Sequence, residues 1–172
     1  EYLSEALRIN NELFSTSSAI KDLIVIGITY RRMAISLDNK TYFTKSLDIY
    51  FQTINALKLL NDERTKIRVL NSIGNIYSDL EIYSEALEYF QNALTQAESV
   101  EDEEAVGMIL NNIGIVYSNL GKYELSTDYF QRAIDRGLEI GDGQVLWEAY
   151  LEIANVYRKQ GEIDSAIINY KN

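Results

Sequence analysis

The sequence predicts an all-α fold, a right-handed superhelix built from antiparallel helix pairs. Three observations predict it. Related residues recur at a constant interval of forty, apolar residues within each interval are spaced by three and four, and the 172 residues include no proline. A helix pair of this kind buries its apolar stripe by packing against the next pair, so the pairs are expected to stack into a solenoid.

The interval of forty is clearest in three successive copies. Equivalent positions hold Tyr77, Tyr117 and Tyr157; Ile73, Ile113 and Ile153; Gly74, Gly114 and Ala154; Tyr83, Tyr123 and Ile163; Ala86, Ser126 and Ala166; and Phe90, Phe130 and Tyr170. One step back gives a degenerate copy with Met33, Ala34, Leu37, Phe43, Ser46 and Tyr50. Matches at so many positions indicate one repeated structural unit.

The elements follow in order along a single domain. We expect the second helix of a partial unit at residues 1–17, full units at 20–60, 62–100 and 102–140, and a truncated unit at 142–172. Asp62, Asp102 and Asp142 precede the first helices of their units, where a side chain can cap the helix N-terminus. Gly121 and Gly161 are placed for left-handed C-terminal caps. Each full unit is therefore predicted to be a helix, a short turn and a second helix.

Small residues mark where the two helices of a unit come closest. Gly74 and Gly114 lie on first helices, and Ala86 and Ser126 lie on second helices. Side chains this small let the helix axes approach, and a large ring such as Phe90 fills the space beside the contact. The sequence therefore predicts tightly packed hairpins.

These residues also carry a family resemblance. The run from Leu110 to Ala133, with Gly114, Tyr117, Gly121, Tyr123, Ser126 and Phe130, resembles the tetratricopeptide repeat, and Leu70 to Ala93 matches it equally well. The interval of forty, longer than the usual 34, looks like the longer-helix variants of kinesin light chains, cell-polarity adaptors and bacterial peptide-sensing regulators. The resemblance implies that the first helices line a concave groove that binds a protein or peptide.

The candidate binding residues lie on the predicted groove face of the first helices. They are Arg31, Ile35, Arg68, Asn71, Asn75, Asn111, Asn112, Asn155 and Arg158. A carboxamide offers a donor and an acceptor together, so a series of Asn side chains can hold a peptide backbone without reading its sequence. The resemblance adds that related repeats use Asn in this way. The alternative is that these amides bond to neighbouring helices or are only solvated.

The three arginines of this set have two interpretations. Arg is suited to bidentate pairing with a carboxylate, so Arg31, Arg68 and Arg158 can receive an acidic ligand. The alternative is ion pairing within the chain, to Asp38, Asp79 or Glu148, or simple solvation.

Composition excludes several functional classes. The chain has no His and no Cys, so the usual acid/base group, thiolate nucleophile and commonest metal ligands are missing. Its formal net charge of -10 opposes binding to nucleic acid or an anionic membrane. No apolar run is long enough to span a bilayer and no signal-peptide pattern opens the chain. We expect a soluble, cytoplasmic protein with no cofactor, no metal and no catalytic activity.

Two functions remain. The first is a non-catalytic scaffold that binds a protein or peptide in the groove. The alternative is a regulatory or sensory input module of a larger bacterial signalling protein, such as a diguanylate cyclase, a sensor kinase or a transcription regulator. Neither end carries an obvious polar capping helix, which solenoids need for solubility. We therefore expect a fragment of a larger protein, or self-association through exposed terminal helices.

Overall fold

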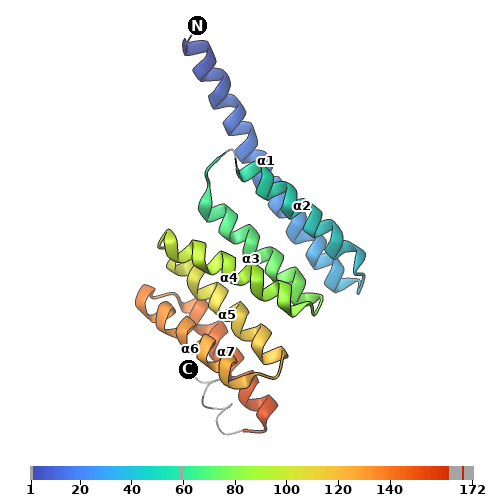
Figure 1. Ribbon diagram of the computed structural model, residues 1–172, viewed down its shortest axis with the longest axis vertical. Coiled ribbons are helices and arrows are strands. Elements are labelled where there is room, and N and C mark those ends of the chain that lie inside the picture. Colours follow the sequence, from blue (N-terminus) through green and yellow to red (C-terminus); the bar gives the residue numbers. More distant parts are fainter. Residues whose placement is uncertain (1, 59, 163–167, 169–172) are drawn as a thin grey trace.

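The computed structural model describes residues 2–58, 60–162 and 168, with side chains from residue 17 onward. Within these residues the chain forms seven helices and no strand, which confirms the all-α prediction. The helices are α1 (Tyr2–Ser36), α2 (Thr41–Leu57), α3 (Glu63–Asp79), α4 (Tyr83–Ser99), α5 (Glu103–Asn119), α6 (Tyr123–Ile140) and α7 (Gly143–Gln160). They form antiparallel hairpins that stack side by side (Figure 1). Across the same residues, no helix is both long and apolar enough to cross a bilayer.

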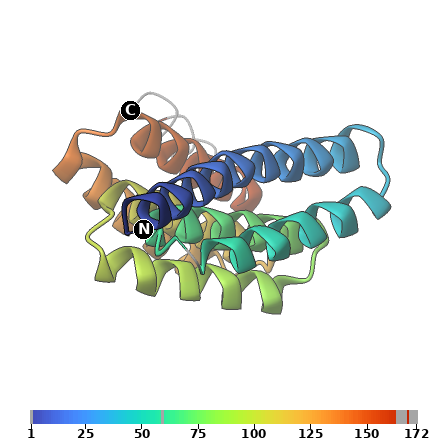
Figure 2. The ribbon, with the colours of Figure 1, turned by 90° about the horizontal axis from the view of Figure 1, so that it is seen from above.

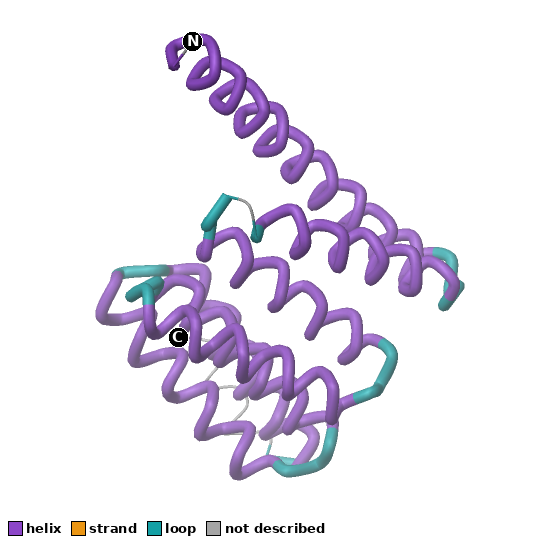
Figure 3. Tube along the Cα trace, turned by 45° about the horizontal axis from the view of Figure 1, so that its top comes forward, coloured by secondary structure: helices purple, strands orange, loops and turns teal. Residues whose placement is uncertain are grey.

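The predicted helix caps of the later units are present in the structure. Asp62 accepts a hydrogen bond from the Thr65 backbone N–H, and Asp102 and Asp142 cap α5 and α7 in the same way. Gly121 and Gly161 have φ angles of 72° and 82°, the left-handed conformation that ends a helix. Only short loops therefore separate successive helices (Figure 3).

The tight hairpin packing is confirmed. A Cβ atom added to Gly74 would lie 2.6 Å from Phe90 Cε1, and one added to Gly114 would lie 2.6 Å from Phe130 Cε1. The Ser126 hydroxyl also donates a hydrogen bond to the Gly114 carbonyl at 2.8 Å. Phe90 and Phe130 are fully buried, so each ring fills the core directly beside the closest approach of its helix pair.

The first hairpin differs from the copy that the sequence predicts. Its close approach is at Gly27, not Ala34: an added Cβ would lie 2.8 Å from Tyr50 Cε1, and Ser46 donates to the Gly27 carbonyl at 2.7 Å. Gly27 and Tyr50 are 23 residues apart, whereas Gly114 and Phe130 are 16 apart. The α1–α2 hairpin therefore contains seven additional residues.

These seven residues lengthen the hairpin at its turn. α1 continues nine residues past Gly27, whereas α5 continues five past Gly114. α2 begins five residues before Ser46, whereas α6 begins three before Ser126, and the α1–α2 turn is one residue longer than the α5–α6 turn. The alignment of α1 with α3 must be shifted accordingly. In Figure 2 this hairpin extends beyond the rest of the stack.

The predicted boundary between residues 17 and 20 is also wrong. α1 is one continuous helix of 35 residues that runs through this point. The physical reason is that no Gly or Pro occurs before Gly27, so nothing in the backbone ends the helix there. At the other end, the predicted second helix of the last unit, with Ile163, Ala166 and Tyr170, lies outside the described residues.

Candidate functional site: the inner helical face

The first helices of the hairpins form one layer of the stack. α3 contacts α5, and α5 contacts α7, while α1 lies beside α3 at the N-terminal end. With the shifted alignment, each helix presents the same four positions to one side. These are Lys21, Ile24, Ile28 and Arg31 in α1; Arg68, Asn71, Asn75 and Ser78 in α3; Met108, Asn111, Ile115 and Ser118 in α5; and Glu148, Leu151, Asn155 and Arg158 in α7. We call this surface the inner face.

Three of the predicted amides lie close together, with Asn71 and Asn75 at inner-face positions of α3 and Asn112 beside them on α5. Asn112 Nδ2 donates a hydrogen bond to Asn71 Oδ1 at 2.9 Å, which joins α5 to α3. Asn75 lies one turn further along α3 and is half-buried, and its amide has no hydrogen-bond partner among the described residues. The arrangement therefore combines a bridged amide pair with an adjacent, half-buried amide that no described side chain or backbone group engages.

Asn111 is not open to a ligand. Its side chain is only 2% exposed, and Nδ2 donates to the Val145 carbonyl at 3.2 Å. Its Oδ1 is buried without a partner in the described part of the chain. Gly107 explains this, because a Cβ there would lie 2.9 Å from Val145 Cγ1, so glycine lets α7 pack closely over α5. The amide that the sequence assigns to the groove instead connects two helices.

Asn155 holds an inner-face position of α7. It is half-buried, and Nδ2 lies 3.4 Å from Glu152 Oε2 on the same helix. Nearby, Lys159 Nζ donates to Ser118 Oγ at 3.0 Å and joins α7 to α5. Polar contacts thus hold α3, α5 and α7 together across this face.

The structure separates the three predicted arginines. Arg31 forms a bidentate ion pair with Asp79, with Nε–Oδ2 and Nη2–Oδ1 distances of 2.5 and 3.1 Å, so it joins α1 to α3. Arg68 and Arg158 are exposed and have no ion-pair partner among the described residues. The intramolecular interpretation therefore holds for Arg31, whereas no such ion pair within the described chain engages the other two.

The shifted alignment also corrects the predicted residues of α1. Ile35 is 55% exposed but lies on the hairpin extension, beyond the end of α3. Lys21 and Ile24 occupy inner-face positions that the interval of forty misses. The signal that identifies them is Gly27-x-x-Tyr30, which repeats the Gly-x-x-Tyr of Gly74 and Gly114 at a different interval.

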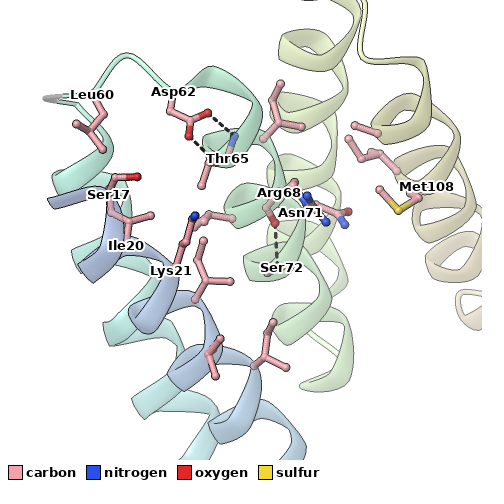
Figure 4. A pocket seen from close by; sticks show the side chains of 17 residues that line it. Ser17, Ile20, Lys21, Leu60, Asp62, Thr65, Arg68, Asn71, Ser72 and Met108 are labelled. Atoms are coloured by element: carbon pink, nitrogen blue, oxygen red, sulfur yellow. Dashed lines mark hydrogen bonds between the residues drawn. The ribbon is translucent and has the colours of Figure 1, made fainter. Parts of the chain in front are cut away.

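A pocket of about 550 Å³ opens between α1 and α3 and reaches α5. Ile20, Ile24, Val25 and Ile28 form its α1 side, and Met108 contributes from α5. Figure 4 shows Lys21 projecting from α1, with Arg68 and Asn71 on α3 around the same space. A second pocket, of about 560 Å³, lies between α3, α5 and α7 and is lined by Ser78, Ile115 and Lys159 among others. The inner face is therefore not uniform, because the first pocket has an apolar α1 wall that the second lacks.

Comparisons with known proteins agree with this fold. A family model described as "Tetratricopeptide repeat" matches residues 65–139, and a second model with the same description matches residues 148–172. No curated protein gives a significant match.

Several solved structures are similar to this chain. Aspartyl phosphate phosphatase F from Bacillus subtilis has a TM-score of 0.75 and 24% identity, over 88% of this chain and 38% of that one. A Rap protein complexed with competence and sporulation factor has a TM-score of 0.70 and 21% identity, over 90% of this chain and 41% of that one. PlcR from Bacillus thuringiensis, in complex with the peptide PapR7 and DNA, has a TM-score of 0.58 and 17% identity, over 98% of this chain and 69% of that one. The chain spans about two fifths of the first two proteins, and at these identities the likeness shows the fold.

Proposed function

Because this chain belongs to the tetratricopeptide-repeat family over residues 65–139 and 148–172, we propose that it is a non-catalytic scaffold whose inner face binds a protein or peptide. The observation that carries the proposal is the half-buried Asn75 amide, unpartnered among the described residues and beside the Asn71–Asn112 pair. An amide in this state already loses part of its hydration, so a ligand backbone that satisfies both its donor and its acceptor is favoured.

Two of the similar structures contain a bound partner, and one of these partners is a peptide. One is a Rap protein in complex with competence and sporulation factor, and the other is PlcR in complex with the peptide PapR7. The starts of α3, α5 and α7 at Glu63, Glu103 and Gly143 support placing the chain among the forty-residue-period variants.

The test compares open and closed amides. Peptides are first selected from a random displayed library on the whole chain, and their affinity is then measured by fluorescence anisotropy. The double variant Asn75→Ala and Asn112→Ala should weaken binding at least about tenfold, because each lost hydrogen bond is worth about 1 kcal/mol. The matched control is Asn111→Ala, which should lower the melting temperature but leave the affinity of the folded protein unchanged. Equal affinity of the double variant and the wild type would contradict the proposal.

A regulatory input module of a larger bacterial signalling protein is the second candidate. It is favoured by the match to 38% of a Bacillus phosphatase and to PlcR, whose structure contains DNA as well as peptide. Both candidates place the protein in the cytoplasm. The sequence of the parent gene decides between them, since an adjoining signalling domain supports the module and uninterrupted repeats oppose it.

We also propose self-association through the α6–α7 end of the stack. Trp147, Leu138 and Ile140 expose 65%, 62% and 41% of their surface there. Light scattering over a range of concentrations should show a dimer that Trp147→Ser weakens. A strict monomer at high concentration would exclude it.

A further inference from the structure

The opening between α1 and α3 has a structural cause. Arg31 and Asp79 hold the C-terminal ends of these helices together, whereas the α1 residues that line the pocket lie further toward the N-terminus. Figure 1 shows α1 leaving the stack toward its N-terminus. By contrast, the Asn71–Asn112 bond joins α3 to α5, and Val145 packs closely against Gly107 between α5 and α7. The α1–α3 pocket thus lies in the interval where neither of these two close contacts occurs, and its lining differs from that of the pocket between α3, α5 and α7.

One wall of this pocket is apolar and exposed. Val25 and Ile28 are 61% and 38% exposed on α1 and lie one turn apart, on the side that lines the pocket. Ile24 and Met108 are half-buried beside them. When a ligand removes exposed branched side chains on a concave surface from water, the burial makes the free energy of binding more favourable. The wall therefore fits apolar ligand side chains.

The charges around the pocket are unbalanced. Its three charged lining residues are Lys21, Asp62 and Arg68. The Asp62 carboxylate is already engaged, since it accepts hydrogen bonds from the Thr65 backbone N–H at 3.0 Å and from Thr65 Oγ1 at 2.6 Å. Lys21 and Arg68 are exposed and have no ion-pair partner among the described residues. In a chain with a net charge of -10, two unpaired cations on one pocket favour an anionic ligand.

We propose that the α1–α3 pocket binds a peptide segment in which apolar side chains adjoin a carboxylate side chain. The apolar residues pack on Val25 and Ile28, and the Asp or Glu carboxylate pairs with Arg68 and Lys21. Asn71, whose Oδ1 is held by Asn112, keeps its Nδ2 for the ligand backbone. This inference rests on the proposed function and names the ligand class of the same face.

The test uses short random peptides displayed on phage and selected on the whole chain, with selected peptides then resynthesised. Enriched peptides should carry Asp or Glu next to Leu, Ile, Val, Phe or Met. Lys21→Glu and Arg68→Glu should each weaken their binding by about tenfold, and added salt should weaken wild-type binding. Lys40→Glu is the matched control, because Lys40 is an exposed lysine outside the pocket, and it should leave affinity unchanged. Circular dichroism confirms that each variant is folded.

Three outcomes overturn the inference, and they separate it from the proposed function. Enrichment of basic peptides contradicts the charge argument. If the selected peptides bind Lys21→Glu and Arg68→Glu as tightly as the wild type but bind Asn75→Ala more weakly, the scaffold proposal stands and the pocket proposal is wrong. If no peptide is enriched, the scaffold and the pocket both fail.

Discussion

At Gly114 the two helices of a hairpin approach so closely that one methyl group does not fit. A Cβ there would lie 2.6 Å from Phe130 Cε1, and Phe130 is fully buried in the core. Gly114→Ala should therefore destabilise the protein by about 1–3 kcal/mol, as overpacked cores do. Urea unfolding measures this change. Gly143→Ala is the control, since no atom lies within 4 Å of its added Cβ, and equal losses in the two variants would contradict the steric explanation.

Tyr50 places a phenol where the second and third units have Phe90 and Phe130. Burial raises the pKa of the Tyr50 hydroxyl above its usual value of 10.0, while a hydrogen bond with Ser72 and the charge of Arg31 act in the opposite direction. A raised pKa means that the folded state favours the protonated phenol. Tyr50 therefore contributes stability below about pH 10 that is lost as the pH rises toward the folded-state pKa.

Tyr50→Phe should remove this alkaline loss. The urea midpoint of the wild type should fall between about pH 8 and about pH 11, and that of the variant should fall less. At neutral pH the two proteins should differ by no more than about 1 kcal/mol, the net worth of one hydrogen bond. Parallel pH profiles for the two proteins would show that Tyr50 is not the group responsible.

Individual side chains also show where sequence reasoning about the site ends. Asn71 and Asn111 occupy equivalent positions, yet Asn71 is half-buried and pairs with Asn112, whereas Asn111 is buried under α7. The difference arises because Gly107 has no side chain, so Val145 of α7 packs directly against it. The equivalent residue in α3 is Ile67, whose buried side chain occupies that space. The residue type at a lining position is readable from the sequence, but its exposure depends on how close the next helix comes.

Among the helices, α7 depends on its N-terminal cap. Asp142 Oδ1 accepts hydrogen bonds from the backbone N–H groups of Gln144 and Val145, at 2.9 and 3.2 Å. Asp142→Ala should cost about 1 kcal/mol of stability, measured by thermal unfolding. Asp142→Asn is the control, because Asn keeps the accepting oxygen and should retain most of the stability. If Asn is as harmful as Ala, the negative charge rather than the hydrogen bond is responsible.

A helix end could be predicted where the sequence places a capping residue, an Asp before the helix or a Gly after it. Asp62, Asp102, Gly121 and Gly161 mark helix ends that the structure confirms. α1 has no such marker before its turn, so its length and its alignment with α3 were not predictable from the interval of forty. This error also affected the predicted site: the interval of forty assigns Ile35 to the inner face, whereas the structure assigns Lys21 to it.

Across the whole molecule, helices contact mainly their neighbours in the stack. Damage at one end should therefore remain local. Phe43→Ala removes a buried ring from α2, a change that costs about 3–5 kcal/mol in a typical core. Hydrogen exchange should become faster in α1 and α2 and stay unchanged in α6 and α7. Equal acceleration in every helix would show that the stack unfolds as a single cooperative unit.

The seven residues added to the α1–α2 hairpin have a consequence for how such chains diverge. Four of them lengthen α1, two lengthen α2 and one lengthens the turn, so all of them lie beyond the closest approach of the two helices. Gly27 still meets Tyr50, and Ser46 still bonds to the Gly27 carbonyl. During evolution, insertions at a hairpin turn therefore change the packing of the two helices little. A sequence comparison at a fixed interval nevertheless misses the repeat that contains them.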